Sequence, residues 1–206
     1  KTNRSCGFHS FDVLFDFATI YTFNESSKAM IVLCNSSEIR VVFFDGVEFT
    51  EEKVLVDSVL IRSATIHSSD LFAVSTDNSV DTYIFNCDHY EKFAAFEAEF
   101  PCAVFIPHPF ALILISYKKA LHFFVVWRDR FIPINNFNNS FPNEKIFPKI
   151  KSITLIDKNA LLAASKSLFV EINIPKSTFP TPPGLNSDFI LLTSFSLAFF
   201  YPLFER

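Results

Sequence analysis

The stretch Ala29–Asp45, AMIVLCNSSEIRVVFFD, decides the fold that the sequence predicts. An apolar run from Ala29 to Cys34 is followed by the polar residues Asn-Ser-Ser, and a second run then ends in Phe44-Asp45. A short apolar run between turn signals is typical of a buried strand. Asn and Ser favour turns because their side chains hydrogen-bond to nearby backbone. The stretch therefore predicts two strands joined by a tight turn.

The same ending, a bulky residue followed by a polar one, recurs three more times along the chain. After Phe44-Asp45 come Phe85-Asn86, Trp127-Arg128 and Ile172-Asn173, at steps of 41, 42 and 45 residues (44 to 85, 85 to 127 and 127 to 172). Self-similarity at a nearly fixed period of this size indicates a repeat architecture. The sequence therefore predicts four repeats of one structural unit.

Each repeat is expected to consist of short strands separated by turns. The triplet Ala-Thr-Ile occurs in the first strand of two repeats, at residues 18–20 and 64–66. The strands that we expect cover residues 18–23, 29–34, 39–44, 47–56, 64–66, 71–74, 80–85, 103–106, 111–115, 121–127, 153–156, 161–164 and 168–172. Regular short strands with turn signals between them predict an all-β fold. Four strands in about 40 residues make the blade of a β-propeller.

These repeats resemble the WD-repeat family, in which the third strand of a blade ends in Trp-Asp and follows a turn and a buried strand of small residues. The resemblance covers Ala18 to Asn173. The chain departs from the family pattern, because no Gly-His dipeptide opens a repeat and none of the four pairs is Trp-Asp. The resemblance implies a WD-like β-propeller with about four recognisable blades. Closed propellers have roughly 4–8 blades, so we expect a small, incomplete or fragmentary ring.

The sequence divides into four parts. Residues 1–17 form an N-terminal segment, in which residues 11–17 are expected to supply a strand that closes the ring. Residues 18–174 form the four blades. Residues 175–187 are rich in proline and contain a glycine, so they are expected to form a linker without regular structure. The chain ends in an apolar segment, residues 188–206.

Residues 189–204 within that last segment carry no charge. A membrane-spanning helix needs about 20 residues, so a run of this length favours a strand or two of a further blade. A segment that docks on a partner is the second interpretation, because an apolar run this long must be covered. A tail anchor is the third, and membrane association is not the expectation.

Charge is distributed unevenly between the two halves of the chain. Residues 1–102 have 7 Lys and Arg against 16 Asp and Glu, whereas residues 103–206 have 11 against 6. Such asymmetry indicates a basic side that could meet an acidic partner or RNA, although two ordinary solvated surfaces would look the same. The candidate binding residues of the basic half are Lys118, Lys119, Arg128, Arg130 and Lys166. Lys118, Lys119 and Lys166 occupy equivalent turns, so we expect them on one face of a propeller.

The sequence contains no motif of a known catalytic or phosphate-binding site. The three glycines are too few for a glycine-rich phosphate loop, and the 28 phenylalanines suit a core better than a catalytic pocket. A zinc site from the pairs Cys6/His9 and Cys87/His89 would need an unusual spacing. Cys102 and His108 are separated along one strand, so they are not expected to act as a nucleophile and base. Carboxylate pairs such as Glu51-Glu52 are interpreted as solvated charges of outer strands. We therefore expect no enzymatic activity, metal or cofactor.

The function expected from the resemblance is that of a non-catalytic scaffold. Propellers of this family present loops on two faces and bind proteins there, so the partners would be proteins of a multi-subunit complex. The alternative is an accessory subunit of an RNA-processing, tRNA-modifying or ribosome-associated complex, which would use the basic half to bind RNA. The first residues lack the apolar core of a signal peptide. Together with the sparse cysteines, this predicts a cytoplasmic or nuclear location.

Overall fold

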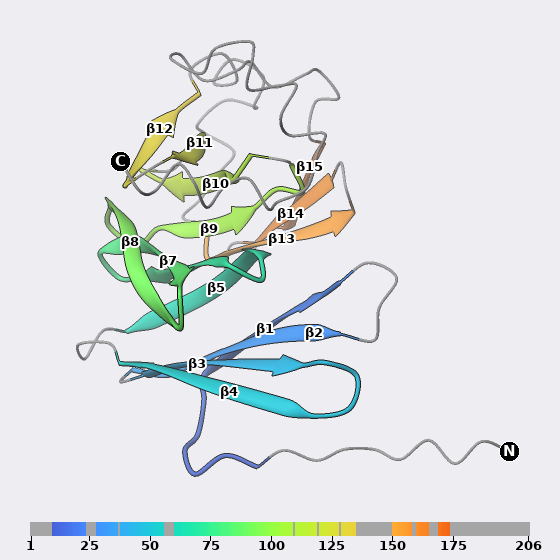
Figure 1. Ribbon diagram of the computed structural model, residues 1–206. Helices are drawn as coiled ribbons and strands as arrows, with labels where there is room; N and C mark the ends of the chain where they lie inside the picture. Colours follow the sequence, from blue (N-terminus) through green and yellow to red (C-terminus); the bar gives the residue numbers. More distant parts are fainter. Residues whose placement is uncertain are drawn as a thin grey trace, which may run out of the picture.

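The computed structural model describes residues 10–23, 28–36, 38–55, 60–108, 110–118, 120–127, 129–134, 150–157, 160–164 and 169–173. Within these ranges the chain is all-β, and no described residue lies in a helix (Figure 1). No helix of the described part is therefore long and apolar enough to cross a membrane. The strands form four antiparallel sheets, which we number in chain order.

Every sheet is a meander in which strands consecutive in sequence are also neighbours. Sheet 1 contains β1 (Phe17–Thr22), β2 (Ala29–Cys34), β3 (Glu38–Phe44) and β4 (Phe49–Leu55). Sheet 2 contains β5 (Ile61–Ser68), β6 (Leu71–Thr76), β7 (Ser79–Asn86) and β8 (His89–Glu97). Sheet 3 contains β9 (Cys102–Phe105), β10 (Leu112–Tyr117), β11 (Ala120–Trp127) and β12 (Arg130–Pro133). The described part of sheet 4 contains β13 (Ser152–Asp157), β14 (Ala160–Ala164) and β15 (Phe169–Asn173).

Polar side chains build the tight turns of these meanders, as expected for a chain with so few glycines. The Asn35 side-chain oxygen accepts from the Glu38 backbone N–H at 2.9 Å. Asp45 accepts from the two backbone N–H groups that follow Gly46, each at 2.8 Å. Thr76 accepts from the N–H groups of residues 78 and 79 through its hydroxyl, at 3.1 and 2.9 Å. Each side chain replaces a backbone partner that a turn would otherwise leave unsatisfied.

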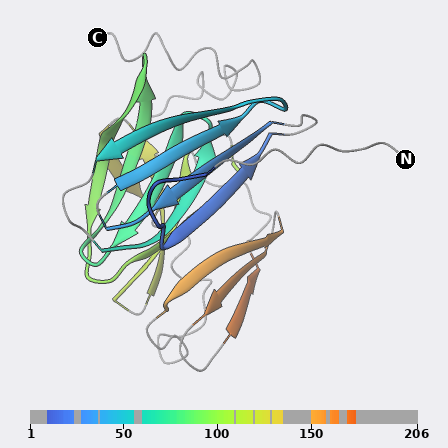
Figure 2. The same cartoon turned by 90° about the horizontal axis from the view of Figure 1, so that it is seen from below.

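The four sheets follow one another with their first strands adjacent. β1 lies against β5, β5 against β9, and β9 against β13. The outer strands are also in contact, β4 with β8 and β8 with β12. In Figure 2, seen from below, sheet 1 lies in front of sheets 2 and 3, and sheet 4 lies to one side of them. This arrangement is consistent with successive blades of a propeller, and the described residues do not show a closed ring.

Apolar side chains fill each space between neighbouring sheets. Sheets 1 and 2 bury a cluster that includes Val32, Val41 and Phe72, all fully buried. Sheets 2 and 3 bury a second cluster around Ile113, and sheets 3 and 4 a third around Leu161. Inner sheets therefore bury both faces, which explains why several strands read as continuous apolar runs rather than as alternating patterns.

The structure confirms the equivalence of the four repeats. Phe44, Phe85, Trp127 and Ile172 each lie at the last or next-to-last position of the third strand of a sheet, in β3, β7, β11 and β15. The expected strand over residues 29–34 coincides with β2. The remaining expected strands each overlap one strand of the structure.

The N-terminal segment differs from its prediction. Residues 11–16 form no strand, and Phe17 is the first residue of β1, so the ring-closing strand is not present over residues 11–17. The segment crosses sheet 1 instead, where the Asp16 N–H donates to the Cys34 carbonyl at 2.9 Å. Asn35 also donates to the Leu14 carbonyl at 3.0 Å. The linker (175–187) and the C-terminal segment (188–206) lie outside the described residues.

Candidate functional site

Two of the five predicted basic residues lie in the described part of the chain. Lys118 is exposed in the turn between β10 and β11, where its φ of 48° is left-handed. Arg130 is the first residue of β12, exposed, and 3.5 Å from the Asp129 carboxylate. Lys119, Arg128 and Lys166 lie outside the described residues.

Lys118 and Arg130 occupy opposite ends of sheet 3. The whole of β11 separates them, and a strand of this length spans roughly 25 Å. The exposed Lys151 precedes β13 and lies at the same end as Lys118. Cys102, the first residue of β9, pairs with Ser116 at that end. Its thiol donates to the carbonyl of Ile150, the residue before Lys151, at 3.7 Å. The structure thus places Lys118 and Lys151 at one end and Arg130 at the other.

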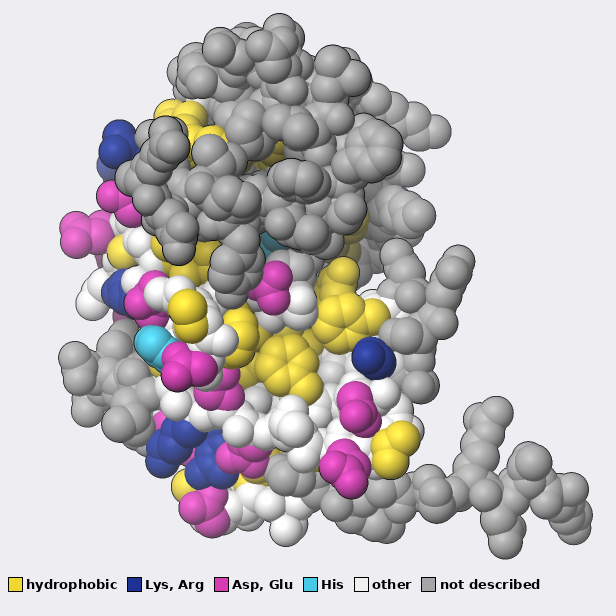
Figure 3. All heavy atoms as spheres, viewed as in Figure 1, with side chains coloured by type: hydrophobic (Ala, Val, Ile, Leu, Met, Phe, Trp, Pro, Cys, Tyr) yellow, Lys and Arg dark blue, Asp and Glu magenta, His cyan; other side chains and the backbone are white. Residues whose placement is uncertain are grey.

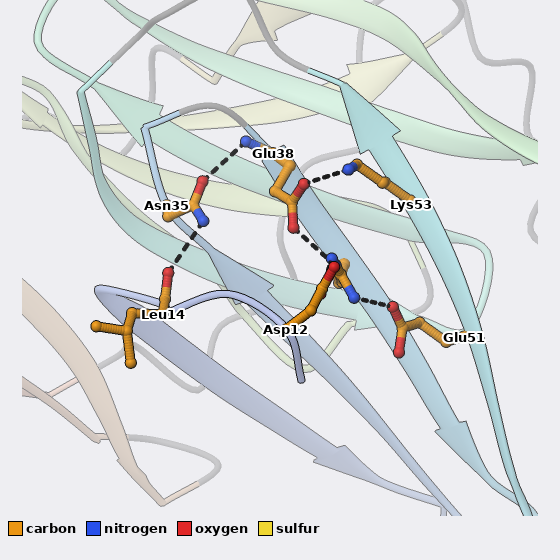
Figure 4. Close-up of polar contacts among 7 residues, drawn as sticks. Asp12, Leu14, Asn35, Glu38, Glu51 and Lys53 are labelled. Carbon is orange, nitrogen blue, oxygen red and sulfur yellow. Dashed lines mark hydrogen bonds and ion pairs between the residues drawn. The ribbon is translucent and has the colours of Figure 1, made fainter. Parts of the chain in front are cut away.

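A buried arginine forms the most extensive group of ion pairs among the described residues (Figure 4). Arg40 of β3 contacts Glu38 at 2.7 Å, Glu51 at 2.5 Å and Asp12 at 2.6 Å. Lys53 adds a contact of 2.5 Å to Glu38. Each guanidinium nitrogen therefore has a carboxylate partner. The hydrogen bonds from Lys53 and Arg40 lower the pKa of Glu38, and the hydrogen bond from Arg40 lowers that of Asp12. This cluster holds the N-terminal segment against sheet 1, and its carboxylates already pair with Arg40.

A second constellation lies where sheets 1 and 2 meet, around the buried ring of Tyr90. The ring stacks on Phe43 of sheet 1, with centroids 6.5 Å apart. It also packs against Phe72 and Phe85 of sheet 2, at 5.2 and 5.0 Å. The hydroxyl donates to the Ser69 carbonyl in the β5–β6 turn. Tyr90 therefore fixes the β5–β6 and β7–β8 turns against sheet 1.

Carboxylates from three separate elements lie near Tyr90 and the neighbouring His89. Glu52 of β4 accepts the Tyr90 backbone N–H. Burial raises the pKa of Tyr90, and the charges of Asp70 and Glu52 raise it further. The hydrogen bond to Asp88 raises the pKa of the neighbouring His89, and the charges of Asp88, Glu91 and Glu52 add to the effect. The contributions of these four carboxylates show that negative charges gather at this end of sheets 1 and 2.

Most of these carboxylates are not neutralised. Within the described ranges, no lysine or arginine forms an ion pair with Glu52, Asp70 or Glu91. Asp88 has only His89 as a charged partner among the described residues, at 2.6 Å. In Figure 3, acidic side chains border an area of hydrophobic side chains at the surface. We call this region the Tyr90 surface and define it by the carboxylates together with half-buried aromatic residues: Glu52, Asp70, Asp88, Glu91, Tyr21, Phe23, Phe43 and Phe85.

Comparison with known proteins assigns no family to this chain. No protein-family model matches it, and no curated protein matches it. The site must therefore be understood from its own geometry.

The cysteine and histidine candidates are not brought together in the described residues. Cys87 is exposed in the β7–β8 turn beside His89, whereas their proposed zinc partners, Cys6 and His9, lie outside the described residues. Cys102 and His108 lie toward opposite ends of β9. Within the described ranges, no group of three or more metal-ligating side chains is found.

Glu51 and Glu52 lie in the outer strand β4, as expected, with Glu51 exposed and Glu52 half-buried, and each also has a specific partner. Both lie in β4, and successive side chains of a strand point to opposite faces. Glu51 therefore reaches Arg40 on the outer face of sheet 1, and Glu52 reaches Tyr90 on the face toward sheet 2. The Tyr90 surface was missed altogether, because its members are scattered between residues 21 and 91.

Proposed function

We propose that this chain is a non-catalytic, WD-like propeller scaffold that binds other proteins within a larger assembly. The observation that carries the proposal is the series of meander sheets packed face to face with their first strands adjacent. Such a series forms a rigid body and leaves its turns at two ends as display surfaces. Fold by itself does not establish function, so the proposal also needs a surface suited to binding.

The Tyr90 surface supplies that support. Its aromatic side chains are held by a packed core between two sheets, so little conformational entropy would be lost when a partner binds. Its polar groups are carboxylates that are exposed or half-buried. A carboxylate acts as a general acid near neutral pH only when desolvation or a like charge raises its pKa. The geometry suits recognition better than proton transfer.

The test is affinity capture of the full chain from its native cells after mild covalent cross-linking. We expect one or a few proteins in stoichiometric amounts, cross-linked to turn residues, and rebinding when the purified partner is mixed with the chain. The proposal fails if the captured proteins match those of an unrelated bait and the native protein migrates at its monomer mass of 23.5 kDa.

The alternative, an RNA-binding accessory subunit, draws support from the exposed Lys118 and Lys151 at one end of sheets 3 and 4. The change Lys118→Glu with Lys119→Glu should then abolish RNA binding that is sensitive to salt. The slope of log affinity against log salt should fall by roughly 1.4 for two lost contacts to single-stranded RNA. Arg130→Glu, at the opposite end, shows separately whether that candidate contributes. RNA affinity that is absent, or that survives the double change, removes this alternative.

A further inference from the structure

We propose that the Tyr90 surface binds an arginine-containing segment of a partner protein. This inference rests on the proposed scaffold function and names the chemistry of the partner. Two properties of the surface carry it. Aromatic rings lie at the junction of sheets 1 and 2, and acidic side chains border a hydrophobic area there (Figure 3). Of these carboxylates, Glu52, Asp70 and Glu91 form no ion pair with a described lysine or arginine.

The aromatic part of the surface is built in, because its rings are held by the buried core. Phe43 and Phe85 pack directly on the buried Tyr90. Tyr21 and Phe23, from the end of β1, meet edge to face at 5.3 Å and pack against the same cluster. All four flanking side chains are half-buried. Aromatic faces attract cations, and the planar guanidinium of arginine stacks on them better than the ammonium of lysine.

The negative charges of the surface favour a partner segment that is positively charged. Glu52 comes from β4, Asp70 from the β5–β6 turn, and Glu91 from β8. Folding brings these carboxylates from separate elements close to Tyr90 and His89, and no described lysine or arginine forms an ion pair with Glu52, Asp70 or Glu91. The Arg40 cluster on the other face of sheet 1 shows that this fold does neutralise carboxylates elsewhere.

Together these features match one kind of partner. An arginine side chain could stack on a half-buried ring while its guanidinium meets a carboxylate in a paired hydrogen bond. Negative potential from several carboxylates would also accelerate the encounter with a basic segment. An uncharged apolar segment would remove water from carboxylates that have no lysine or arginine partner among the described residues, which is unfavourable.

The probe is a fluorescein-labelled peptide of alternating glycine and arginine, titrated with the full chain and followed by fluorescence anisotropy. Its controls are the same peptide with every arginine replaced by glutamine or by lysine. We expect binding of the arginine peptide, weaker binding of the lysine peptide, and none of the glutamine peptide. Raising the salt from about 0.01 M to about 0.15 M, which shortens the Debye length, should weaken the complex.

Charge-reversal variants locate the binding. Asp70→Lys with Glu91→Lys should weaken binding about tenfold or more, because two attractions become repulsions. Glu97→Lys with Glu99→Lys is the matched control, since it makes the same change of net charge at the exposed opposite end of sheet 2. This control should retain most of the affinity. Far-ultraviolet circular dichroism and the melting temperature of each variant verify that it is folded.

Three results would overturn the inference: equal losses in the two double variants, equal affinity for the arginine and glutamine peptides, or self-association of the chain that Asp70→Lys with Glu91→Lys abolishes. The last result would assign the surface to the basic half of a second copy. A chain that captures cellular partners but does not distinguish the peptides refutes this inference and leaves the scaffold proposal standing. A chain that binds the arginine peptide but has no cellular partner refutes the scaffold proposal alone.

Discussion

Replacing Phe72 with alanine tests the packing on which the whole arrangement of sheets 1 and 2 depends. Phe72 is fully buried on β6. Its ring stacks on Tyr83 at 5.1 Å and meets Tyr90 at 5.2 Å. Truncation of a buried phenylalanine costs about 3–5 kcal/mol, including the cavity that remains. Because two ring contacts are also lost, we expect Phe72→Ala to lower the free energy of unfolding by about 5 kcal/mol, the upper end of this range.

The measurement is urea unfolding followed by two signals. Circular dichroism reports all sheets, whereas fluorescence of the single tryptophan, Trp127, reports sheet 3. If the sheets unfold as one cooperative unit, Phe72→Ala should lower both transitions together. The matched control is Phe49→Ala at the end of sheet 1, where the half-buried ring pairs with Phe44 at 4.8 Å. A cross-strand pair of this kind contributes about 0.2–1 kcal/mol.

Two outcomes would refute this reasoning. A loss in Phe72→Ala no larger than that in Phe49→Ala would show that the ring is not part of a close-packed core. A Trp127 transition that stays unchanged while the circular dichroism transition moves would show that sheet 3 unfolds independently of sheets 1 and 2. In that case the sheets would not form the rigid body that the scaffold proposal requires.

Three further predictions concern a charge, a hydrogen bond and a thiol. The pKa of Glu38 is lowered in the folded state, so the stability that Glu38 contributes is present above its unfolded pKa and is lost as pH falls through the folded pKa. When the melting temperature is measured at decreasing pH, it should therefore fall less in Glu38→Gln than in the parent protein. Thr65→Val removes the hydroxyl that accepts the Phe105 N–H at 3.0 Å between sheets 2 and 3, and denaturation should show a loss of about 1–3 kcal/mol, with Thr65→Ser nearly neutral. Burial raises the pKa of the Cys34 thiol to about 12, so a thiol reagent followed by peptide mass spectrometry should label the exposed Cys87 in the native protein and Cys34 only after unfolding.

Much of the fold could be predicted because its signals are local. Apolar runs of strand length, separated by Asn, Asp, Ser and Thr, mark hairpins without reference to the rest of the chain. The end of β3 at Phe44 is an example, since Asp45 immediately caps the following turn. The prediction over residues 11–17 was wrong because that segment is apolar enough for a strand, yet its position depends on distant groups. Arg40 contacts Asp12 across 28 positions of sequence, and no local pattern reveals that ion pair.

The basic residues show what strand order alone adds to a prediction. Lys118 lies between the second and third strands of its sheet, whereas Arg130 follows the third. In an antiparallel meander, successive turns alternate between the two ends of the sheet. Counting strands along the sequence is therefore enough to place these two side chains at opposite ends. The Tyr90 surface is different, because it needs the relative placement of two sheets, which the pattern of single strands does not contain.

The neighbours Glu51 and Glu52 give the physical reason to regard the Tyr90 surface as functional. They share one strand and one chemistry, and the pleat alone sends them to opposite faces of sheet 1. On one face the fold supplies Arg40, which neutralises Glu51 and holds the N-terminal segment. On the other face Glu52 accepts the Tyr90 backbone N–H, and no lysine or arginine among the described residues forms an ion pair with it. One more basic residue there would add only about 0–1 kcal/mol as an exposed ion pair, so the charge on this face bears on recognition more than on stability, and a cationic partner is what we propose to meet it.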